Sequence, residues 1–142
     1  MKKKIGMVLG ILVVGFGLIL LTKLPILGLD EPEFCGGCHV MDGQLETYMH
    51  SAHRDVTNCG NCHIPHSLVP GATYKAYTGT KDLIGVVFDK DPYHIQASPM
   101  AKDIIQENCL RCHGDFLGDI GDTSEDGGKY CFDCHRSTPH MK

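Results

Sequence analysis

Four copies of one short motif constrain this chain more than any other feature. Each copy reads Cys-x-x-Cys-His, and together they use all eight cysteines of the 142 residues. In such a motif the two thiols bind a porphyrin and the histidine binds its iron. A redox dithiol or half of a zinc site also uses a cysteine pair, but neither needs a histidine after each of four pairs. The motifs therefore predict four covalently bound haem c groups.

Four haems change what the rest of the chain has to bury. Roughly 110 residues follow the N-terminal apolar run, too few to cover four macrocycles with an ordinary hydrophobic core. We therefore expect a mostly α-helical fold with extensive irregular structure, in which the haems form the core. The motif spacing indicates two dihaem modules, at about residues 29–68 and 105–142. Without haem this part of the chain is expected to be unfolded.

The N-terminus resembles a membrane anchor. Three lysines precede an apolar run from Ile5 to Thr22 that contains no charged residue, and a helix of this length is about 27 Å long, close to the hydrocarbon thickness. A cleaved signal peptide is the alternative, but its apolar region is usually shorter, about 7–15 residues. We expect residues 1–28 to form a cytoplasmic tip and an uncleaved, single-pass transmembrane anchor in the inner (cytoplasmic) membrane. The lysines then place the N-terminus in the cytoplasm and residues 29–142 in the periplasm.

Charge and composition narrow the range of partners. The formal net charge is −4, and haem propionates add negative charge. Basic residues beyond the N-terminus are scattered and form no patch, which excludes nucleic-acid binding. Gly6 and Gly10 form a GxxxG pattern, which allows two helices to approach closely. This pattern predicts self-association through the transmembrane helix, or packing against a partner's helix.

The long gap between the second and third motifs is free for a role other than haem binding. Within it, residues 69–90 are expected to be amphipathic and partly helical after Pro70, with a short helix leading into the third motif. Residues 118–129, between the third and fourth motifs, are expected to form an exposed, mobile loop.

Histidines outside the motifs are candidates for the second axial ligand of each iron. Six-coordinate iron in four haems needs eight ligands, and besides the motif histidines the chain has five others: His50, His53, His66, His94 and His140. On a helix His66 would point the same way as His63, three residues before it, so we expect it to serve a different haem. His140 follows His135 by five residues, at most about 17 Å of extended chain, and is also expected to reach a neighbouring haem.

Three of these histidines are favoured as distal ligands: His53, His66 and His140. His50 competes with His53 because both precede the second motif, and His94 is expected to be a surface or hydrogen-bonding residue. One haem is therefore short of a second histidine. In the first motif Met41 stands two residues beyond His39, and a methionine sulfur is also a ligand of haem iron. From these residues alone, either His39 or Met41 can hold the first iron.

Several segments are similar to those of the NapC/NirT family of tetrahaem quinol dehydrogenases. They are the N-terminal anchor, CGGCHVM, SAHRDVTNCGNCHIPH, the region around KAYTGTKD, and CFDCHRSTPHMK. Within this family the resemblance is strongest to the small membrane subunits of cytochrome c nitrite reductase, and it is weakest at residues 88–108 and 114–129. It implies a membrane-anchored subunit that oxidises menaquinol and passes electrons to a periplasmic pentahaem nitrite reductase. The alternatives are an anchored electron carrier for another periplasmic reductase, without its own quinol site, and an enzyme whose first haem itself reduces a small molecule.

The resemblance also implies a ligand set for each haem. The first haem would be bound by Cys35 and Cys38, with Met41 in place of His39 as the protein ligand of its iron. The other three would each have two histidines. These sets are Cys59, Cys62, His63 and His140 for the second haem, Cys109, Cys112, His113 and His53 for the third, and Cys131, Cys134, His135 and His66 for the fourth.

The quinol site of the family corresponds to Lys75 and Asp82. These residues are seven apart, about two helical turns, and share one stripe if the segment is helical. A carboxylate near the quinol ring can accept one of its protons, and a lysine can hydrogen-bond the quinol oxygen while keeping the carboxylate ionised. The alternative is that Lys75 and Asp82 form a solvated ion pair, which contributes little to the stability of the fold.

Overall fold

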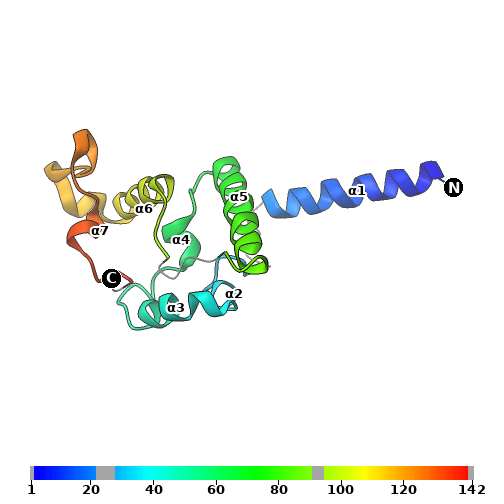
Figure 1. Ribbon diagram of the computed structural model, residues 1–142. Coiled ribbons are helices and arrows are strands. Elements are labelled where there is room, and N and C mark those ends of the chain that lie inside the picture. The colour runs from blue at the N-terminus through cyan, green and yellow to red at the C-terminus, as the bar shows by residue number, and fades with distance from the viewer. Residues whose placement is uncertain (1, 22–27, 91–94, 141–142) are drawn as a thin grey trace.

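A computed structural model describes residues 2–21, 28–90 and 95–140. Within these ranges the chain consists of helices and irregular segments and contains no strand, which confirms the prediction of a mostly helical fold. One long helix, α1 (Lys2–Leu21), projects from a small helical domain (Figure 1). The elements of that domain are α2 (Pro32–Cys35), η2 (His39–Met41), α3 (Asp42–Met49), α4 (Cys59–His63), α5 (Leu68–Val87), α6 (Pro99–Leu117), η3 (Gly118–Ile120), η4 (Glu125–Gly127) and α7 (Cys131–Cys134).

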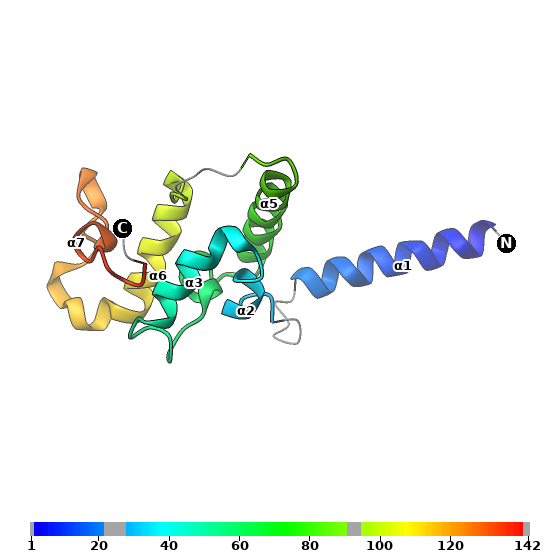
Figure 2. The same cartoon turned by 60° about the horizontal axis from the view of Figure 1, so that its bottom comes forward.

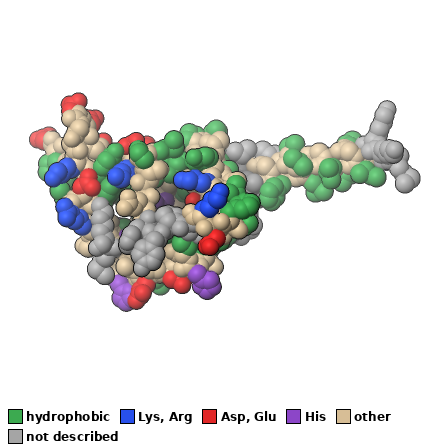
Figure 3. All heavy atoms as spheres, viewed as in Figure 1, with side chains coloured by type: hydrophobic (Ala, Val, Ile, Leu, Met, Phe, Trp, Pro, Cys, Tyr) green, Lys and Arg blue, Asp and Glu red, His purple; other side chains and the backbone are tan. Residues whose placement is uncertain are grey.

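The helix α1 accounts for the N-terminal apolar run. Its large apolar side chains, from Ile5 to Phe16, are exposed, and hydrophobic side chains follow this part of the helix (Figure 3). Across residues 2–21, 28–90 and 95–140, no helix combines the length and hydropathy that a membrane crossing needs. The prediction of a helix here is confirmed, whereas that of a transmembrane span is not. The end of the predicted anchor, at residues 22–27, lies outside the described residues.

Few side chains of the domain are buried. Among the described residues only Tyr48, Ala72 and Ile104 are buried hydrophobic residues, and Gln106 and Asn108 are buried polar ones. A domain of this size normally buries many apolar side chains, because burial of apolar surface is its main source of stability. The helices are therefore arranged without the usual core, as expected for a chain that wraps large cofactors.

The helix α6 links the second motif to the third. Its Asn108 is buried, and the side-chain amide donates hydrogen bonds to the backbone carbonyls of Cys62 at 2.9 Å and Ile64 at 3.1 Å. These carbonyls end α4, so the amide satisfies groups that the short helix leaves free. Because Asn108 directly precedes the third motif, this contact fixes the second and third motifs side by side.

The buried Gln106, one helical turn before the third motif, links α6 to the fourth. Its side chain is 2% exposed. The amide donates to Asp122 Oδ1 at 2.7 Å, and the amide oxygen accepts the backbone N–H of Cys131 at 2.8 Å. Asp122 also accepts the backbone N–H and the hydroxyl of Ser124. These hydrogen bonds hold the pKa of Asp122 below its usual value. The loop after α6, which was predicted to be exposed and mobile, is thus mainly exposed but tied to α6.

Gln106→Leu is expected to lower the free energy of unfolding of the haem-loaded protein by about 2 kcal/mol. The substitution keeps the side chain's approximate size but leaves the N–H of Cys131 and one carboxylate bond of Asp122 without a partner. Denaturant unfolding followed by circular dichroism measures the change. Glu107→Gln, at the exposed neighbouring position, is the control and should change stability by less than about 0.5 kcal/mol. Equal effects of the two substitutions would contradict this role of Gln106.

The helix α5 lies between α1 and the rest of the domain. It begins at Leu68 and runs to Val87, so it starts earlier than predicted and is helical throughout. Pro70 lies in its first turn, where the missing N–H costs nothing because no carbonyl of the helix would bond it. α5 contacts α1 and runs crosswise to it (Figures 1 and 2). The residues of the predicted quinol site therefore lie on the helix of the domain nearest to α1.

Candidate haem and quinol sites

The four motifs lie in a row that follows their order in the chain. The first and second meet at their leading cysteines, where the thiol of Cys59 donates a hydrogen bond to the sulfur of Cys35. This bond, together with the positive charge of Lys75, lowers the pKa of the free Cys35 thiol to about 7. The same bond and burial raise the pKa of Cys59. In the thiol form, the leading cysteines of the first two motifs are therefore direct neighbours.

The remaining motifs continue this row. α4 packs on α6, and Cys62 of the second motif is close enough to Cys112 of the third for its pKa to be raised by that thiol as well as by burial. Burial likewise raises the pKa of Cys109 in the third motif, to about 11. The thiol of Cys131 in the fourth motif and other nearby cysteines contribute to this increase. α6 and α7 lie at the end of the domain away from α1 (Figure 1). The row thus leads from the α1 side of the domain to the opposite end.

The cysteines of the motifs are chemically available for haem attachment. All eight are free thiols, and none is half of a disulfide. Two motifs form a short helix of their own, α4 on the second and α7 on the fourth. The third lies instead in the last turns of α6, and the first spans the end of α2 and the start of η2.

His63 and His140 face each other across a gap that fits one iron. Their ring centroids are 6.1 Å apart. Two imidazoles that bind one iron from opposite sides have centroids about 6 Å apart, because each ligating nitrogen lies about 2 Å from the metal and about 1 Å from its ring centre. Although part of His63 is exposed, desolvation and the nearby His140 lower its pKa to about 4, and desolvation also lowers the pKa of His140. Both rings are therefore neutral near pH 7, as iron ligation requires.

Thr47 orients the ring of His140. The threonine hydroxyl lies 3.0 Å from the carbonyls of Gly43 and Gln44, to which it donates, and 3.2 Å from Nδ1 of His140. Since its proton is used toward the backbone, the hydroxyl oxygen accepts the N–H at Nδ1. This fixes the tautomer and leaves the lone pair on Nε2 of His140, the usual arrangement of a metal-binding histidine.

His53 and His113 form a second facing pair. Their ring centroids are also 6.1 Å apart, with the ring planes at 68°. Each ring can turn about its own metal–nitrogen bond, so this angle is compatible with a shared iron. His53 lies in the irregular segment after α3, and His113 lies in the last turns of α6. Two of the three predicted histidine pairs are thus brought together by segments distant in the sequence.

The third predicted pair, His66 and His135, is not brought together in this way. In the described part of the chain no ring contact joins these two histidines, and Nε2 of His66 lies 3.1 Å from the carbonyl of Asn61. That carbonyl can only accept, so Nε2 carries the proton here. The helix α4 ends at His63, and Ile64 is extended. The expectation that His66 and His63 share a helix face is therefore wrong.

The first motif contrasts an exposed histidine with a half-buried methionine. The side chain of His39 is fully exposed, and its Nδ1 lies 3.6 Å from a carboxylate oxygen of Asp42. Met41, at the end of η2, is half-buried. The choice of Met41 as ligand of the first iron stays a prediction.

His50 shows no ligand-like arrangement among the described residues. His50 ends α3 with its Nδ1 2.8 Å from the carbonyl of Glu46, and it is exposed. His94, predicted to be a surface residue, lies outside the described residues. Of the two histidines that precede the second motif, only His53 faces the ring of a motif histidine.

Lys75 lies beside the first motif in an ion pair that sequence reasoning missed. Its ammonium is 2.5 Å from a carboxylate oxygen of Asp30, and both side chains are roughly one-third exposed or less. The backbone carbonyl of Asp30 also accepts the N–H of Gly60 at 3.3 Å. A side chain at Gly60 would collide with that of Asp30. Asp30 thus joins α5 to the second motif and holds Lys75 near Cys35.

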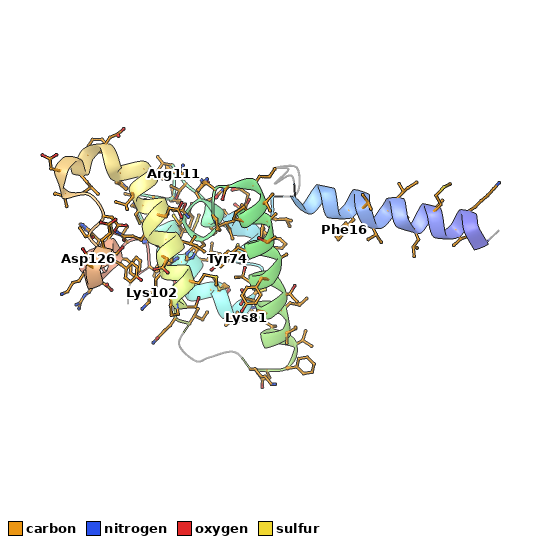
Figure 4. The ribbon with its side chains drawn as sticks, turned by 90° about the horizontal axis from the view of Figure 1, so that it is seen from above. Phe16, Tyr74, Lys81, Lys102, Arg111 and Asp126 are labelled. Carbon is orange, nitrogen blue, oxygen red and sulfur yellow. The ribbon has the colours of Figure 1, made fainter. Side chains whose placement is uncertain are left out.

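Asp82 lies two turns beyond Lys75 on α5. Tyr74 is half-buried on the side of α5 that faces the rest of the domain (Figure 4). Burial raises the pKa of Tyr74, and the negative charge of Asp82 raises it further. The acidic partner that contacts Lys75 is thus Asp30, whereas Asp82 acts farther along the helix. No sequence signal pointed to Asp30, because it precedes the first motif and is 45 residues from Lys75.

These features define a class of protein. Four thiol pairs in a row, two pairs of histidine rings at iron-bridging distance and a nearly absent apolar core together fit covalently bound haem. The chain is a c-type cytochrome. A sequence profile described as the NapC/NirT cytochrome c family, N-terminal region, matches residues 1–142, and the chain belongs to this family.

Curated relatives are consistent with this membership. The chain is 32% identical over 113 residues to the cytochrome c nitrite reductase subunit NrfH of Nitratidesulfovibrio vulgaris, covering 80% of this chain and 69% of the relative. It is 27% identical to NrfH of Wolinella succinogenes, covering 80% and 70%. It is also 27% identical to NapC of Escherichia coli K12, covering 78% and 68%.

A solved structure shares the fold. It is the crystal structure of a cytochrome c nitrite reductase NrfHA complex bound to the inhibitor HQNO. The TM-score is 0.74 at 30% identity, over 95% of this chain and 90% of the matched one. The predicted membership of the NapC/NirT family and similarity to NrfH are confirmed.

Proposed function

We propose that this chain is a membrane-anchored tetrahaem cytochrome c that oxidises menaquinol and passes the electrons to a periplasmic nitrite reductase. The observation that carries the proposal is the position of Lys75. It lies on α5, the helix nearest α1, and its ammonium forms an ion pair with Asp30, five residues before Cys35 of the first motif. The ammonium can donate a hydrogen bond to a quinol oxygen beside the first haem site. This site is at the end of the domain that carries α1, where a lipid-soluble substrate would arrive.

The residues that would hold the four haems are those of the predicted ligand sets. His63 with His140 and His53 with His113 are supported by their centroid separations. For the first iron, Met41 is supported by its half-buried position beside a solvent-exposed His39. His135 with His66 rests on the family resemblance alone. When bound, the haems supply one-electron transfer, which the row of motifs from the α1 end to the far end of the domain would serve.

The chemistry at the quinol is assigned to three side chains. Oxidation of one quinol releases two electrons and two protons, so a proton acceptor is needed near its hydroxyl groups. Asp82 takes that role as a general base, and the Lys75 ammonium donates a hydrogen bond to a quinol oxygen. Asp30 fixes the ammonium through the ion pair at 2.5 Å. Both residues belong to α5, and the ammonium of Lys75 is also held by Asp30, from the segment before the first motif.

The membrane attachment is assigned to α1. Its support is the uncharged run that begins at Ile5, its exposed apolar side chains, and the lysines before it. A shallow open groove on α1, lined by Met7, Gly10, Ile11, Val14 and Gly15, supports packing against a second helix, from another copy of the chain or from a partner. The reductase is assigned as cytochrome c nitrite reductase because two curated relatives are named NrfH and the solved relative is an NrfHA complex.

Asp82→Asn is expected to slow reduction of the haems by a menaquinol analogue by about 100-fold, because an amide cannot accept the quinol proton. The haem-loaded protein is placed in lipid vesicles, and haem reduction is followed by absorbance after mixing with the quinol. Asp89→Asn, at the exposed position just after α5, removes an equal charge and should leave the rate unchanged. Dithionite should reduce all three proteins alike. An unchanged rate for Asp82→Asn would leave the electron-carrier alternative standing.

A further inference from the structure

The last residues of α5, after Asp82, and Phe88, which directly follows the helix, form an exposed apolar surface. Leu83 and Val87 are 64% and 67% exposed, and Ile84 and Phe88 are 50% and 64% exposed. We call these four residues the outer face of α5. Large apolar side chains are seldom left together in water on a soluble surface, and such patches usually contact a partner or a membrane.

The outer face points away from the haem-binding side of the helix. Leu83 follows Tyr74 by nine residues and Ile84 follows Lys75 by nine, a separation of about two and a half turns that places each on the opposite side of the helix. Tyr74 and Lys75 are half-buried toward the domain, and Lys75 reaches Asp30. A haem held by Cys35 would therefore lie on the side of α5 opposite Leu83 and Ile84.

The outer face lies on the side of α5 away from the rest of the domain. α5 runs crosswise to α1 in every ribbon view, and the rest of the domain lies on its other side; the outer face is at the end of α5 farther from α1 (Figures 1, 2 and 4). Hydrophobic side chains are visible on α1 and on the edge of the domain nearest to it (Figure 3). A helix that runs crosswise to a membrane-inserted helix lies along the membrane surface.

We propose that the outer face of α5 lies in the lipid–water interface and contacts the bilayer directly. This inference rests on the proposed attachment through α1. Apolar residues on one side and lysines at the edge are typical of interfacial helices. Lys81 is exposed and lies two residues before Leu83. Lys90 follows Phe88, and its ammonium is 5.9 Å from the centre of the Phe88 ring. Both can bind lipid phosphates while their neighbours enter the apolar layer.

The consequence is a route for the substrate. The stripe of α5 that carries Lys75 and Asp82 is turned away from the outer face. A helix in the interface would therefore bring the quinol site to the depth at which a quinol head group resides. A quinol could then reach the site from within the lipid without passing through water.

Single introduced cysteines test the lipid contact. In the haem-loaded protein the native cysteines are consumed by haem, so Leu83→Cys or Val87→Cys carries the reactive thiol. Glu125→Cys is the control, because it is exposed in η4 at the end of the domain remote from α1 (Figure 1). Each protein is reconstituted in lipid nanodiscs and treated either with a water-soluble maleimide or with a phospholipid that carries a maleimide on its head group.

The two reagents should give opposite results. We expect Leu83→Cys and Val87→Cys to react at least about tenfold more slowly than Glu125→Cys with the soluble reagent, and to be modified by the lipid reagent when Glu125→Cys is not. Protein that enters the discs but reacts equally at all three positions would overturn the lipid contact and leave the α1 anchor intact. Protection from both reagents would instead indicate that another protein surface, such as a second copy, covers the face. Protein that does not associate with the discs would overturn the anchor and the lipid contact together.

Discussion

Replacing His140 with alanine is expected to convert one haem iron of the protein from six-coordinate low-spin to high-spin. The ring of His140 faces that of His63 at the separation of two ligands on one iron, and Thr47 holds its Nδ1–H so that Nε2 is free to ligate. Removal of the ring leaves that iron with His63 alone. Electron paramagnetic resonance and visible spectra of the oxidised protein measure the change, and electron delivery to a reductase should fall more than about tenfold, because the axial ligand sets the reduction potential.

Two other substitutions make this result specific. His50→Ala removes an exposed histidine whose Nδ1 bonds the carbonyl of Glu46, and it should leave every haem signal unchanged. Thr47→Val keeps the ligand but removes its hydrogen bond, and it should shift the same signal that His140→Ala abolishes. A normal low-spin spectrum in His140→Ala would show that another residue binds the second iron.

Replacing Met41 with leucine is expected to change the spectrum of a different haem, the one attached to Cys35 and Cys38. Leucine has nearly the same size but no sulfur lone pair, so the iron loses its ligand while the packing is kept. The half-buried position of Met41, next to a fully exposed His39, makes the methionine the better placed of the two. Magnetic circular dichroism detects the loss of a methionine ligand, and haem reduction by menaquinol should slow by at least about tenfold.

The matched substitution is His39→Ala in the same motif. It should leave the iron coordination and the menaquinol reduction rate within about twofold of the parent protein, because a side chain on the surface contributes little. Loss of the first haem's ligand in His39→Ala, with a normal spectrum in Met41→Leu, is the outcome that would reverse the assignment.

Much of the fold could be predicted because the motifs determine it. Four haem attachment sites in so short a chain leave little room for anything except short helices around them, and few buried apolar side chains are found. The start of α5 was misplaced, since Pro70 was taken as a boundary although a proline is tolerated in the first turn of a helix. The loop after α6 was expected to be exposed and mobile. Its attachment through Gln106 and Asp122 depends on a buried amide that no periodic pattern distinguishes.

The candidate site was predictable where a residue's chemistry is tied to the motif. Histidines near the motifs were foreseen as ligands, and His53 and His140 indeed face motif histidines. Asp30 and Thr47 were missed because their roles arise from contacts across 45 and 93 residues. Neither residue differs in the sequence from any other aspartate or threonine. The reasoning on His66 failed because it assumed a helix that ends three residues earlier.

The order of the motifs in space bears on how the chain folds. Each motif contacts the next one along the sequence, so these contacts can form in the order in which the chain is made. The contact between Thr47 and His140 is different, because it spans 93 residues. It cannot form until residue 140 has been made. The second haem site, although its cysteines are made early, would therefore be completed late, and loss of His140 would leave it open.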